Sequence, residues 1–371
     1  MAAVTVSISS TISLIGSSAS VIVSDPNGRD LITNADALYI NNYLNGIHAA
    51  SNPDAVDFDR NGIISGVDFA KVMNFIGTGT QYTVQSVQPQ TTDINDYANY
   101  FVYNAQTGVR NNDKNYLLFP APLESNTESG AASTYGTGII GGHDDRVIDW
   151  SKSGAVKITT SSGFGSGFVI GPHTIATAAH CVYSKSSNSG CQSIKIRLFN
   201  ADGTLSQEVN AVEAHVPHKY VSDNYDDLAY DYAVLTVNEN LSSYYQFDLG
   251  VALDPAIDNE QAVTSTGFPA QVNGTTVNNL NTNCMYSSTG CLIKSDPTNP
   301  RDETRQIYYS NDTTAGNSGG PIYVTENFNG QTYKTVIGIT SSIPWDSDEY
   351  NTGTRITTEL LRFFKFNPNL S

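Results

Sequence analysis

The position of the histidines relative to one serine constrains this chain more than any other feature. Ser318 stands between glycines in the run Gly-Asn-Ser-Gly-Gly-Pro at residues 316–321, and a G-x-S-x-G run is the nucleophile signature of the α/β-hydrolase fold. That fold needs its catalytic histidine after the serine, whereas all six histidines of this chain precede Ser318. The α/β-hydrolase fold is therefore excluded, and a base for this serine must come from earlier in the chain.

One histidine and one aspartate suit the roles of base and orienting acid. His180 follows the apolar run at residues 168–170 in a turn of small residues, Thr-Ala-Ala-His-Cys, where an imidazole can reach across a cleft. Asp231 directly precedes a strongly apolar strand pattern at residues 232–237, which favours a buried carboxylate that holds one histidine tautomer. We therefore expect His180 as general base and Asp231 as the acid that orients it.

Ser318 is the expected nucleophile. Its hydroxyl is weak until a base removes the proton, and its glycine neighbours leave room for a substrate carbonyl. The backbone N–H groups of Gly316 and Ser318 are expected to form an oxyanion hole. A glycine-flanked serine, a histidine or an aspartate each has an ordinary structural explanation. Their joint occurrence in the order His, Asp, Ser is what indicates acyl-transfer chemistry.

Short strand patterns dominate the chain after residue 139. Apolar or alternating runs at residues 167–170, 194–198 and 335–339 are separated by turn-rich loops, which is typical of a sandwich or a barrel. Only residues 356–366 have a helical pattern in this region. We therefore predict an all-β catalytic domain.

Residues 24–80 contain two similar units 32 residues apart, each an Asp/Asn-rich loop followed by an apolar helix pattern. Calcium needs several oxygen ligands from one short loop and a glycine at the sharp turn. The second loop matches fully, with Gly62 at the turn and ligand positions at Asp57, Asp59, Asn61, the carbonyl of Ile63, Ser65 and Asp68. The first loop offers Asp25, Asn27, Thr33 and Asp36. We expect two structural calcium ions, with weaker or rearranged binding in the first loop because Arg29 and Asp30 replace a ligand and the turn glycine. A solvated turn is the alternative for each loop.

This small α-helical unit of paired EF-hand-like loop–helix repeats, with Asp at position twelve, resembles a type I dockerin, the module that attaches enzymes to cohesin-bearing cellulosome scaffolds. The resemblance implies calcium binding and a cohesin partner. It also implies that loop positions ten and eleven contact the cohesin, namely Asn34 and Ala35 in one repeat and Gly66 and Val67 in the other. Because the two pairs differ, a symmetric dual binding mode is not expected.

The four cysteines fall into two close pairs, Cys181 with Cys191 and Cys284 with Cys291. An even cysteine count in a polar, Ser/Thr/Asn-rich chain favours disulfides and an oxidising, extracellular setting. Buried thiols are the alternative. We predict one disulfide within each pair.

Charge and hydropathy narrow the range of partners. The chain has 36 acidic and 19 basic residues, and the resulting charge of −17 repels nucleic acids and anionic membranes. Residues 1–23 are apolar but broken by serines and too polar to span a bilayer, so we expect a lead in the place of a signal peptide, or a strand. Neither nucleic-acid binding nor membrane insertion is expected.

The catalytic region resembles the chymotrypsin-fold serine proteases. The resemblance rests on residues 165–181, which read Gly-Ser-Gly-Phe-Val-Ile-Gly-Pro-His-Thr-Ile-Ala-Thr-Ala-Ala-His-Cys, and on the motif at residues 316–321. The segment Ile-Ile-Gly-Gly-His-Asp-Asp-Arg at residues 139–146 and the Gly-Phe-Pro turn at residues 267–269 are similar to bacterial secreted glutamyl endopeptidases. The resemblance implies two six-stranded β-barrels with the cleft between them, peptide-bond hydrolysis through an acyl-enzyme, and no catalytic cofactor.

Four residues are candidates for the substrate pocket. Glutamyl endopeptidases read an acidic P1 residue with a histidine, a threonine five before the serine and the mature N-terminal amine; Thr313 is present here, but Thr340 replaces the histidine. Asp312 stands where trypsin keeps its pocket carboxylate and could attract Lys or Arg, although Asp-Thr also occurs in bacterial relatives without that preference. Ser341 completes the set, and the P1 preference stays open. Since Asn317 replaces the aspartate that pairs with the new N-terminus in trypsin, we do not expect activation through that ion pair.

The chain is thus predicted to have four segments, with residues 1–23 as a lead, 24–80 as the dockerin-like module, 81–138 as linker or propeptide and 139–371 as the protease domain. We hypothesise that cleavage near Ile139 activates a zymogen and frees it from the dockerin. The predicted function is a secreted, trypsin-like serine endopeptidase that acts on proteins or peptides while docked on a cohesin scaffold. The alternative is a non-catalytic docking or adhesion protein built on a protease-like barrel.

Overall fold

The computed structural model describes the second predicted calcium loop and nearly all of the predicted protease domain. The described residues are 5–8, 21–22, 34–46, 53–78, 83–85, 100–110, 138–151, 154–161, 163–222, 228–294, 305–343 and 349–365. The expected ligands Asp25, Asn27 and Thr33 of the first loop lie outside the described residues.

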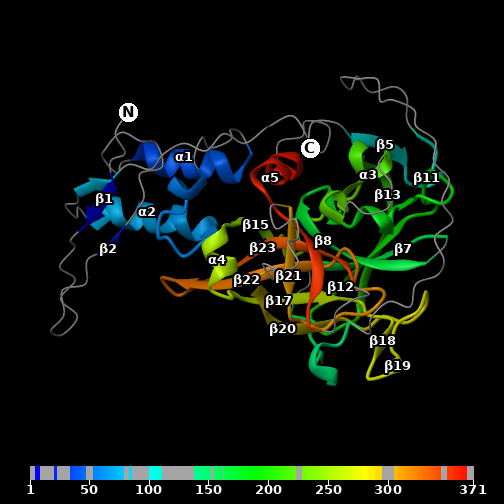
Figure 1. Cartoon of the computed structure of the whole chain (residues 1–371). Coiled ribbons are helices and arrows are strands. Elements are labelled where there is room, and N and C mark those ends of the chain that lie inside the picture. Colours follow the sequence, from blue (N-terminus) through cyan, green and yellow to red (C-terminus); the bar gives the residue numbers. More distant parts are fainter. Residues whose placement is uncertain are drawn as a thin grey trace.

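Six antiparallel strands close into a first barrel (Figure 1). In barrel order they are β12 (Lys195–Phe199), β7 (Ala155–Thr159), β8 (Phe164–Gly171), β9 (Thr174–Thr177), β14 (Ala233–Val237) and β13 (Leu205–Pro217). Pairing of β12 with β13 completes the circle, with Ile196 opposite Val209. A closed barrel leaves no exposed strand edge, which suits a sequence of short alternating strands.

A second barrel is closed in the same way. Its strands are β23 (Gln331–Ser342), β22 (Pro321–Phe328), β17 (Ala262–Gly267), β20 (Tyr286–Ile293), β21 (Gln306–Tyr309) and β24 (Asn351–Arg355). Strand β24 pairs back onto β23, while the short β15 (Asp248–Leu249) and β6 (Val147–Ile148) extend the sheet at β23 and β20. The chain therefore has the two six-stranded barrels expected from its sequence.

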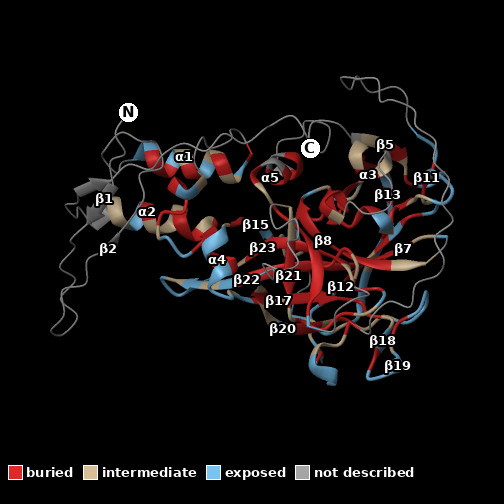
Figure 2. Cartoon of the chain, viewed as in Figure 1, coloured by how far each residue is buried: buried red, intermediate tan, exposed pale blue. Residues whose placement is uncertain are grey.

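Branched apolar side chains fill each barrel, and Figure 2 shows the buried residues gathered along the barrel strands. Val156 and Ile158 are fully buried in the first barrel, as are Ile322 and Ile337 in the second. β-Branched residues fit the pleated, half-buried surface of a strand, and burial of each such side chain contributes about 1.5–3 kcal/mol. The barrels touch through aromatic rings, with the centroids of Phe199 and Phe268 5.2 Å apart.

The C-terminal helix and several short elements cover the barrels. Helix α5 (Thr358–Lys365) lies within the range predicted as helical, and its Phe363 ring is 5.3 Å from that of Tyr232. The short elements are α3 (His218–Ser222), α4 (Asp254–Asp258), β10 (Tyr183–Ser184), β11 (Ser189–Gly190), β18 (Gln271–Val272) and β19 (Thr275–Thr276), with 3-10 turns η1 (Pro53–Ala55), η3 (Ile140–Gly142), η4 (Ala179–Cys181) and η5 (Leu228–Tyr230). In the part of the chain that is described, no helix is long and apolar enough to cross a membrane.

Two helices form the N-terminal module, drawn in blue beside α4 and β22 in Figure 1. Helix α1 (Asn34–Leu44) and helix α2 (Gly66–Thr78) follow the two predicted loops. Ile40 of α1 and Val72 of α2 are both fully buried in one cluster. A separate small sheet orders β2 (Val21–Ile22), β1 (Thr5–Ile8) and β4 (Thr83–Gln85).

The module is joined to the second barrel by a strand pair that the sequence did not predict. Strand β3 (Ile63–Ile64), inside the second calcium loop, pairs antiparallel with β16 (Val251–Ala252). The side chain of Ile63 is buried in the same cluster as Ile322 and Ile337 of the barrel. The loop therefore contributes to the core of the second barrel.

The predicted linker also contains a barrel element. Strand β5 (Tyr100–Asn104) pairs with β13 over five residues as an added strand of the first sheet. Ala105 is fully buried, and the side-chain amide of Gln106 donates to the carbonyl oxygens of Ile194 (2.9 Å) and Ala211 (2.8 Å). Residues 100–110 are thus part of the folded first barrel.

The predicted disulfides are not formed. All four cysteines are described, and no disulfide links them. Cys291 lies on β20, while Cys284 precedes that strand. At about 3.3 Å per residue, the five steps from Tyr286 to Cys291 alone span about 16 Å, far beyond the reach of a disulfide. The Cys181 thiol is directed at the carbonyl oxygen of Ser318, 3.4 Å away.

Candidate active site

Strand pairing brings His180 and Asp231 to the same edge of the first barrel. Ala233 at the start of β14 pairs with Thr177 at the end of β9. His180 lies in the turn η4 that follows β9, and Asp231 lies just before β14. Because these strand ends are paired, the two residues are adjacent at the same edge of the sheet. The two residues that the sequence predicted as base and acid are neighbours in the structure.

Asp231 is buried and held by three hydrogen bonds. One oxygen, Oδ2, lies 2.7 Å from Nδ1 of His180 and also accepts from the Ser341 hydroxyl, while Oδ1 accepts the backbone N–H of His180 at 2.9 Å. Burial raises the pKa of Asp231, but His180 and Ser341 lower it more, and the net shift is downward. Asp231 is thus an anion at neutral pH. Ser341, expected in the substrate pocket, contacts this carboxylate.

The other face of the His180 ring remains accessible. Its side chain is 38% exposed although Asp231 beside it is 2% exposed. Burial lowers the pKa of His180, while the charge of Asp231 and the thiol of Cys181 raise it, and the net shift is well above the ordinary value. The imidazole is therefore a strengthened base that is bonded to Asp231 through Nδ1 while part of its side chain is exposed.

Ser318 lies beside the turn that carries His180. Its carbonyl oxygen accepts hydrogen bonds from the backbone N–H of Ser166 at 2.8 Å and from the Cys181 thiol at 3.4 Å. Gly319 has φ +85°, and a Cβ there would lie 2.2 Å from both the Ser166 carbonyl oxygen and the Thr177 hydroxyl. Only glycine allows this approach, which packs the serine turn onto the ends of β8 and β9.

The backbone around Gly316 leaves two donors available. Gly316 has φ +96°, and a Cβ there would lie 2.5 Å from the carbonyl oxygen of Phe268. Its own carbonyl turns away, accepting from the Ser166 hydroxyl at 2.7 Å. No described residue accepts from the backbone N–H of Gly316 or of Ser318. These two N–H groups have the character required of oxyanion-hole donors.

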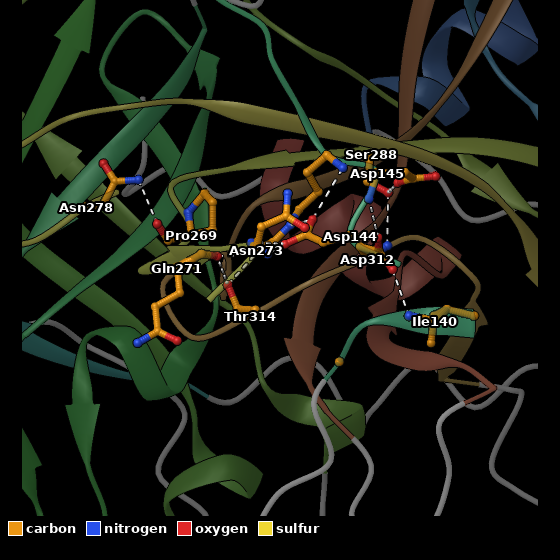
Figure 3. Close-up of polar contacts among 12 residues, drawn as sticks. Ile140, Asp144, Asp145, Pro269, Gln271, Asn273, Asn278, Ser288, Asp312 and Thr314 are labelled. Carbon is orange, nitrogen blue, oxygen red and sulfur yellow. Dashed lines mark hydrogen bonds and ion pairs between the residues drawn. The ribbon is translucent and has the colours of Figure 1, made fainter. Parts of the chain in front are cut away.

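The carboxylate of Asp312, a candidate pocket residue, accepts hydrogen bonds from the backbone of this chain (Figure 3). It is 3% exposed, and its oxygens accept the backbone N–H groups of Ile140 (2.7 Å) and Asp145 (2.9 Å). Burial raises the pKa of Asp312, and these two bonds only partly oppose the rise. Thr313, also buried, donates its backbone N–H to the carbonyl of Gly138 at 2.9 Å. Thr340 is buried and bonds through its backbone, accepting from Gly319 at 2.7 Å.

A buried ion pair between Arg146 and Asp144 lies near the residues just before Ser318, and the sequence analysis did not predict it. Arg146 and Asp144 are 2.7 Å apart, with their side chains 1% and 4% exposed. Arg146 also donates to the Thr314 hydroxyl and to the carbonyl of Gln271, both at 2.8 Å. Thr314 lies four residues before Ser318. The Asp-Asp-Arg run at residues 144–146 was the sequence signal that could have revealed this pair.

The second predicted calcium loop gathers its carboxylates as expected. Oxygens of Asp57, Asp59 and Asp68 lie within 4.8 Å of one another. Burial raises the pKa of Asp57 to about 7 despite backbone hydrogen bonds that lower it, and burial raises that of Asp68 well above its usual range. The raised pKa values show that Asp57 and Asp68 resist ionisation without a cation, and three carboxylates this close together suit a hard dication, which prefers oxygen ligands. The Lys71 ammonium contacts Asp59 and so supplies one positive charge beside the three carboxylates.

Backbone geometry in this loop also fits calcium. Gly62 has φ +86°, and a Cβ there would lie 2.6 Å from the backbone nitrogen of Ala256. The side-chain oxygen Oδ1 of Asn61 accepts a hydrogen bond from the backbone N–H of Ile63 at 2.7 Å, and Ser65 is fully buried. Asp36, the one first-loop ligand that is described, is fully buried at the start of α1.

The four expected cohesin contacts differ in accessibility. Asn34 and Ala35 are exposed at the start of α1. Val67 is 1% exposed, and Gly66 faces the ring of Tyr333 on β23, with a Cβ position 3.7 Å from it. The pair in the second repeat therefore includes one buried residue and one that faces β23 of the second barrel, whereas the pair in the first repeat is exposed.

Comparison with known proteins agrees with this architecture. A family model for trypsin matches residues 139–364, and a model for the dockerin type I domain matches residues 23–77. A glutamyl endopeptidase of Bacillus licheniformis is 25% identical over 242 residues, which are 63% of this chain and 70% of the relative.

Further relatives share shorter stretches. An extracellular metalloprotease of Bacillus subtilis is 26% identical over 216 residues, 56% of this chain and 59% of the relative, and a trypsin of Phaedon cochleariae is 30% identical over 136 residues, 36% of this chain and 50% of the relative. A solved structure of a Glu endopeptidase in complex with MPD is 21% identical with a TM-score of 0.47, and the match covers 62% of this chain and 98% of that one. Since the trypsin model matches more than half of its residues, the chain belongs to the trypsin family of peptidases, and it carries a dockerin type I domain on the N-terminal side of the peptidase region.

Proposed function

We propose that this chain is a serine endopeptidase with Ser318 as nucleophile, His180 as general base and Asp231 as the acid that orients the base. The observation that carries the proposal is the 2.7 Å contact between His180 Nδ1 and the buried Asp231 carboxylate, next to the turn that holds Ser318. A carboxylate in this position fixes the imidazole tautomer, so that Nε2 is left with its lone pair toward the cleft.

The reaction follows from this arrangement. Nε2 of His180 takes the proton of the Ser318 hydroxyl as the oxygen attacks the substrate carbonyl, and the Asp231 charge stabilises the imidazolium that forms. The oxyanion receives hydrogen bonds from the N–H groups of Gly316 and Ser318. Collapse breaks the C–N bond, and His180 returns the proton to the leaving amine. Water then hydrolyses the acyl-enzyme by the same steps.

The substrate is a protein or peptide whose P1 side chain is not selected by Asp312. Both oxygens of this carboxylate accept backbone N–H groups, from Ile140 and Asp145, so that little of its charge is left for a Lys or Arg of the substrate. The histidine that reads acidic P1 residues in glutamyl endopeptidases is replaced by Thr340. We therefore propose a preference set by the size and polarity of the pocket.

The N-terminal module binds calcium and docks on a cohesin. The ligands in the second loop are Asp57, Asp59, Asn61, the Ile63 carbonyl, Ser65 and Asp68, and a bound ion would supply the positive charge that keeps these oxygens together. The open first repeat, with Asn34, Ala35 and the 58% exposed Leu38 one turn later, forms the cohesin contact. A cohesin partner implies an extracellular, cellulosome-like setting. Residues 81–138 form a linker or propeptide of which residues 100–110 pack on the first barrel, and cleavage near Ile139 yields the mature enzyme.

Hydrolysis of a peptide library tests the peptidase proposal against a non-catalytic docking protein. The full chain is assayed with and without prior limited proteolysis near Ile139, beside Ser318→Ala and the control Ser243→Ala at an exposed turn residue. We expect hydrolysis by the wild type and the control and none by Ser318→Ala. No hydrolysis by any form would favour the docking protein.

A further inference from the structure

Glu326 connects the catalytic domain to the second calcium loop. It lies on β22 of the second barrel, and its oxygens accept hydrogen bonds from the side-chain amide of Asn61 and from the hydroxyl of Ser65, both at 2.8 Å. Asn61 and Ser65 occupy loop positions five and nine, which supply ligands in such loops. The β3–β16 pair next to it keeps the loop on the barrel.

These two hydrogen bonds determine which atoms face the loop. A carboxylate only accepts hydrogen bonds, so Asn61 must present its NH2 group to Glu326 and turn Oδ1 toward the backbone N–H of Ile63, 2.7 Å away. Ser65 gives its proton to Glu326 and accepts the N–H of Val67 at 3.1 Å, which leaves one lone pair of the hydroxyl. Asn61 Oδ1 and Ser65 Oγ thus each keep one lone pair that no hydrogen bond from the described residues uses, as a metal ligand requires.

Through its hydrogen bonds to Asn61 and Ser65, Glu326 also brings a further carboxylate to the loop that holds the cluster of Asp57, Asp59 and Asp68. Lys71 supplies one positive charge at the edge of this group. A divalent cation in the loop would offset the remaining repulsion.

We infer that Glu326 is a positioning residue for the second calcium loop, so that the loop has its full calcium affinity only while it is docked on the second barrel. This inference rests on the calcium-binding part of the proposed function and not on the peptidase part. Groups that orient the ligands of a metal are typically worth about 10–100-fold in affinity.

Calorimetric titration of the chelator-stripped full chain with calcium tests the inference. The second-loop event is identified as the one lost in Asp57→Asn. We expect Glu326→Gln to weaken this event by about 10–100-fold. The control Glu208→Gln removes one charge from an exposed pair with Arg197 on the first barrel and should leave the affinity unchanged. Melting in chelator separates a merely structural role, because that role would lower the calcium-free Tm of Glu326→Gln and leave the affinity intact.

A second variant keeps the test decisive if Glu326→Gln folds poorly. Asp is a normal ligand at position five, so Asn61→Asp would bind calcium at least as well as the wild type if Glu326 had no role. With Glu326 opposite, we expect weaker binding in Asn61→Asp and recovery in Asn61→Asp/Glu326→Gln. Equal affinities in wild type and Glu326→Gln, or unimpaired binding in Asn61→Asp, would overturn the inference. Absence of the second-loop event in the wild type would instead show that the calcium proposal itself has failed.

Discussion

Nδ1 of His180 lies 2.7 Å from Oδ2 of the buried Asp231, and this contact sets the basicity of the imidazole. The carboxylate raises the pKa of His180 well above 6.5 although burial opposes the rise. Since only the neutral ring can take a proton, activity should increase with pH through the raised pKa. The acid limb of kcat/KM is therefore expected to have its midpoint above pH 6.5.

The variant Asp231→Asn should shift the acid limb of the kcat/KM profile to lower pH. Without the carboxylate charge, the burial that lowers the pKa of His180 is no longer outweighed, and the midpoint should shift to lower pH. The amide also favours the wrong tautomer, which is expected to lower kcat by about 10⁴. A pH–rate profile of the variant measures both effects, and an unchanged midpoint would contradict the proposed role of Asp231.

Substrate profiling tests whether Asp312 recognises the P1 side chain of the substrate. Because the carboxylate accepts two backbone N–H groups, we expect no strong preference for Lys or Arg at P1. The ratio of kcat/KM for a Lys substrate to that for its Gln analogue should stay within about threefold of 1, a free-energy difference below about 0.7 kcal/mol. A Lys preference of a hundredfold or more that disappears in Asp312→Asn would show that the residue reads the substrate.

Replacing one partner of the Arg146–Asp144 pair should lower the free energy of unfolding. Both side chains are buried, so Arg146→Met leaves the Asp144 charge without its partner, and we expect a loss of about 3–5 kcal/mol in the free energy of unfolding. Asp144→Leu/Arg146→Met removes both charges and should recover much of that loss. Denaturant unfolding of the two variants checks the comparison. A single-variant effect below about 1 kcal/mol would show that the pair carries little stability.

Cleavage near Ile139 should not release the N-terminal part. Strand β5 pairs with β13 over five residues, and β3 pairs with β16, so that two strand pairs hold this part on the barrels after the chain is cut. We expect the cleaved N-terminal piece to co-elute with the catalytic domain in gel filtration and to separate only in denaturant. Elution as an independent species under native conditions would support the earlier hypothesis that maturation frees the enzyme from its dockerin.

The sequence predicted the elements with a local signature. Alternating strands, the turn before His180 and the aspartate-rich loop at residues 57–68 each follow from side chains close together in the chain, and the barrels and the carboxylate cluster appear where expected. The order of His180, Asp231 and Ser318 along the chain further limited which fold can bring them together.

Long-range contacts had no such signature. Glu326 is 265 residues from Asn61, and nothing near either residue indicates that they meet. Strand β5 lies in a polar stretch that reads as a linker, because its burial depends on β13 more than a hundred residues later. The predicted Cys284–Cys291 disulfide is absent for a related reason: the spacing of these two cysteines along the sequence does not reveal that an extended strand separates them.

Covalent labelling with a fluorophosphonate probe tests the central claim most directly, since the probe reacts only with a serine that a neighbouring base has activated. The account predicts one label per chain on Ser318, located by peptide mapping, with no label in Ser318→Ala and labelling at least about a thousandfold slower in His180→Ala. A label on another residue, or an undiminished rate in His180→Ala, would contradict it.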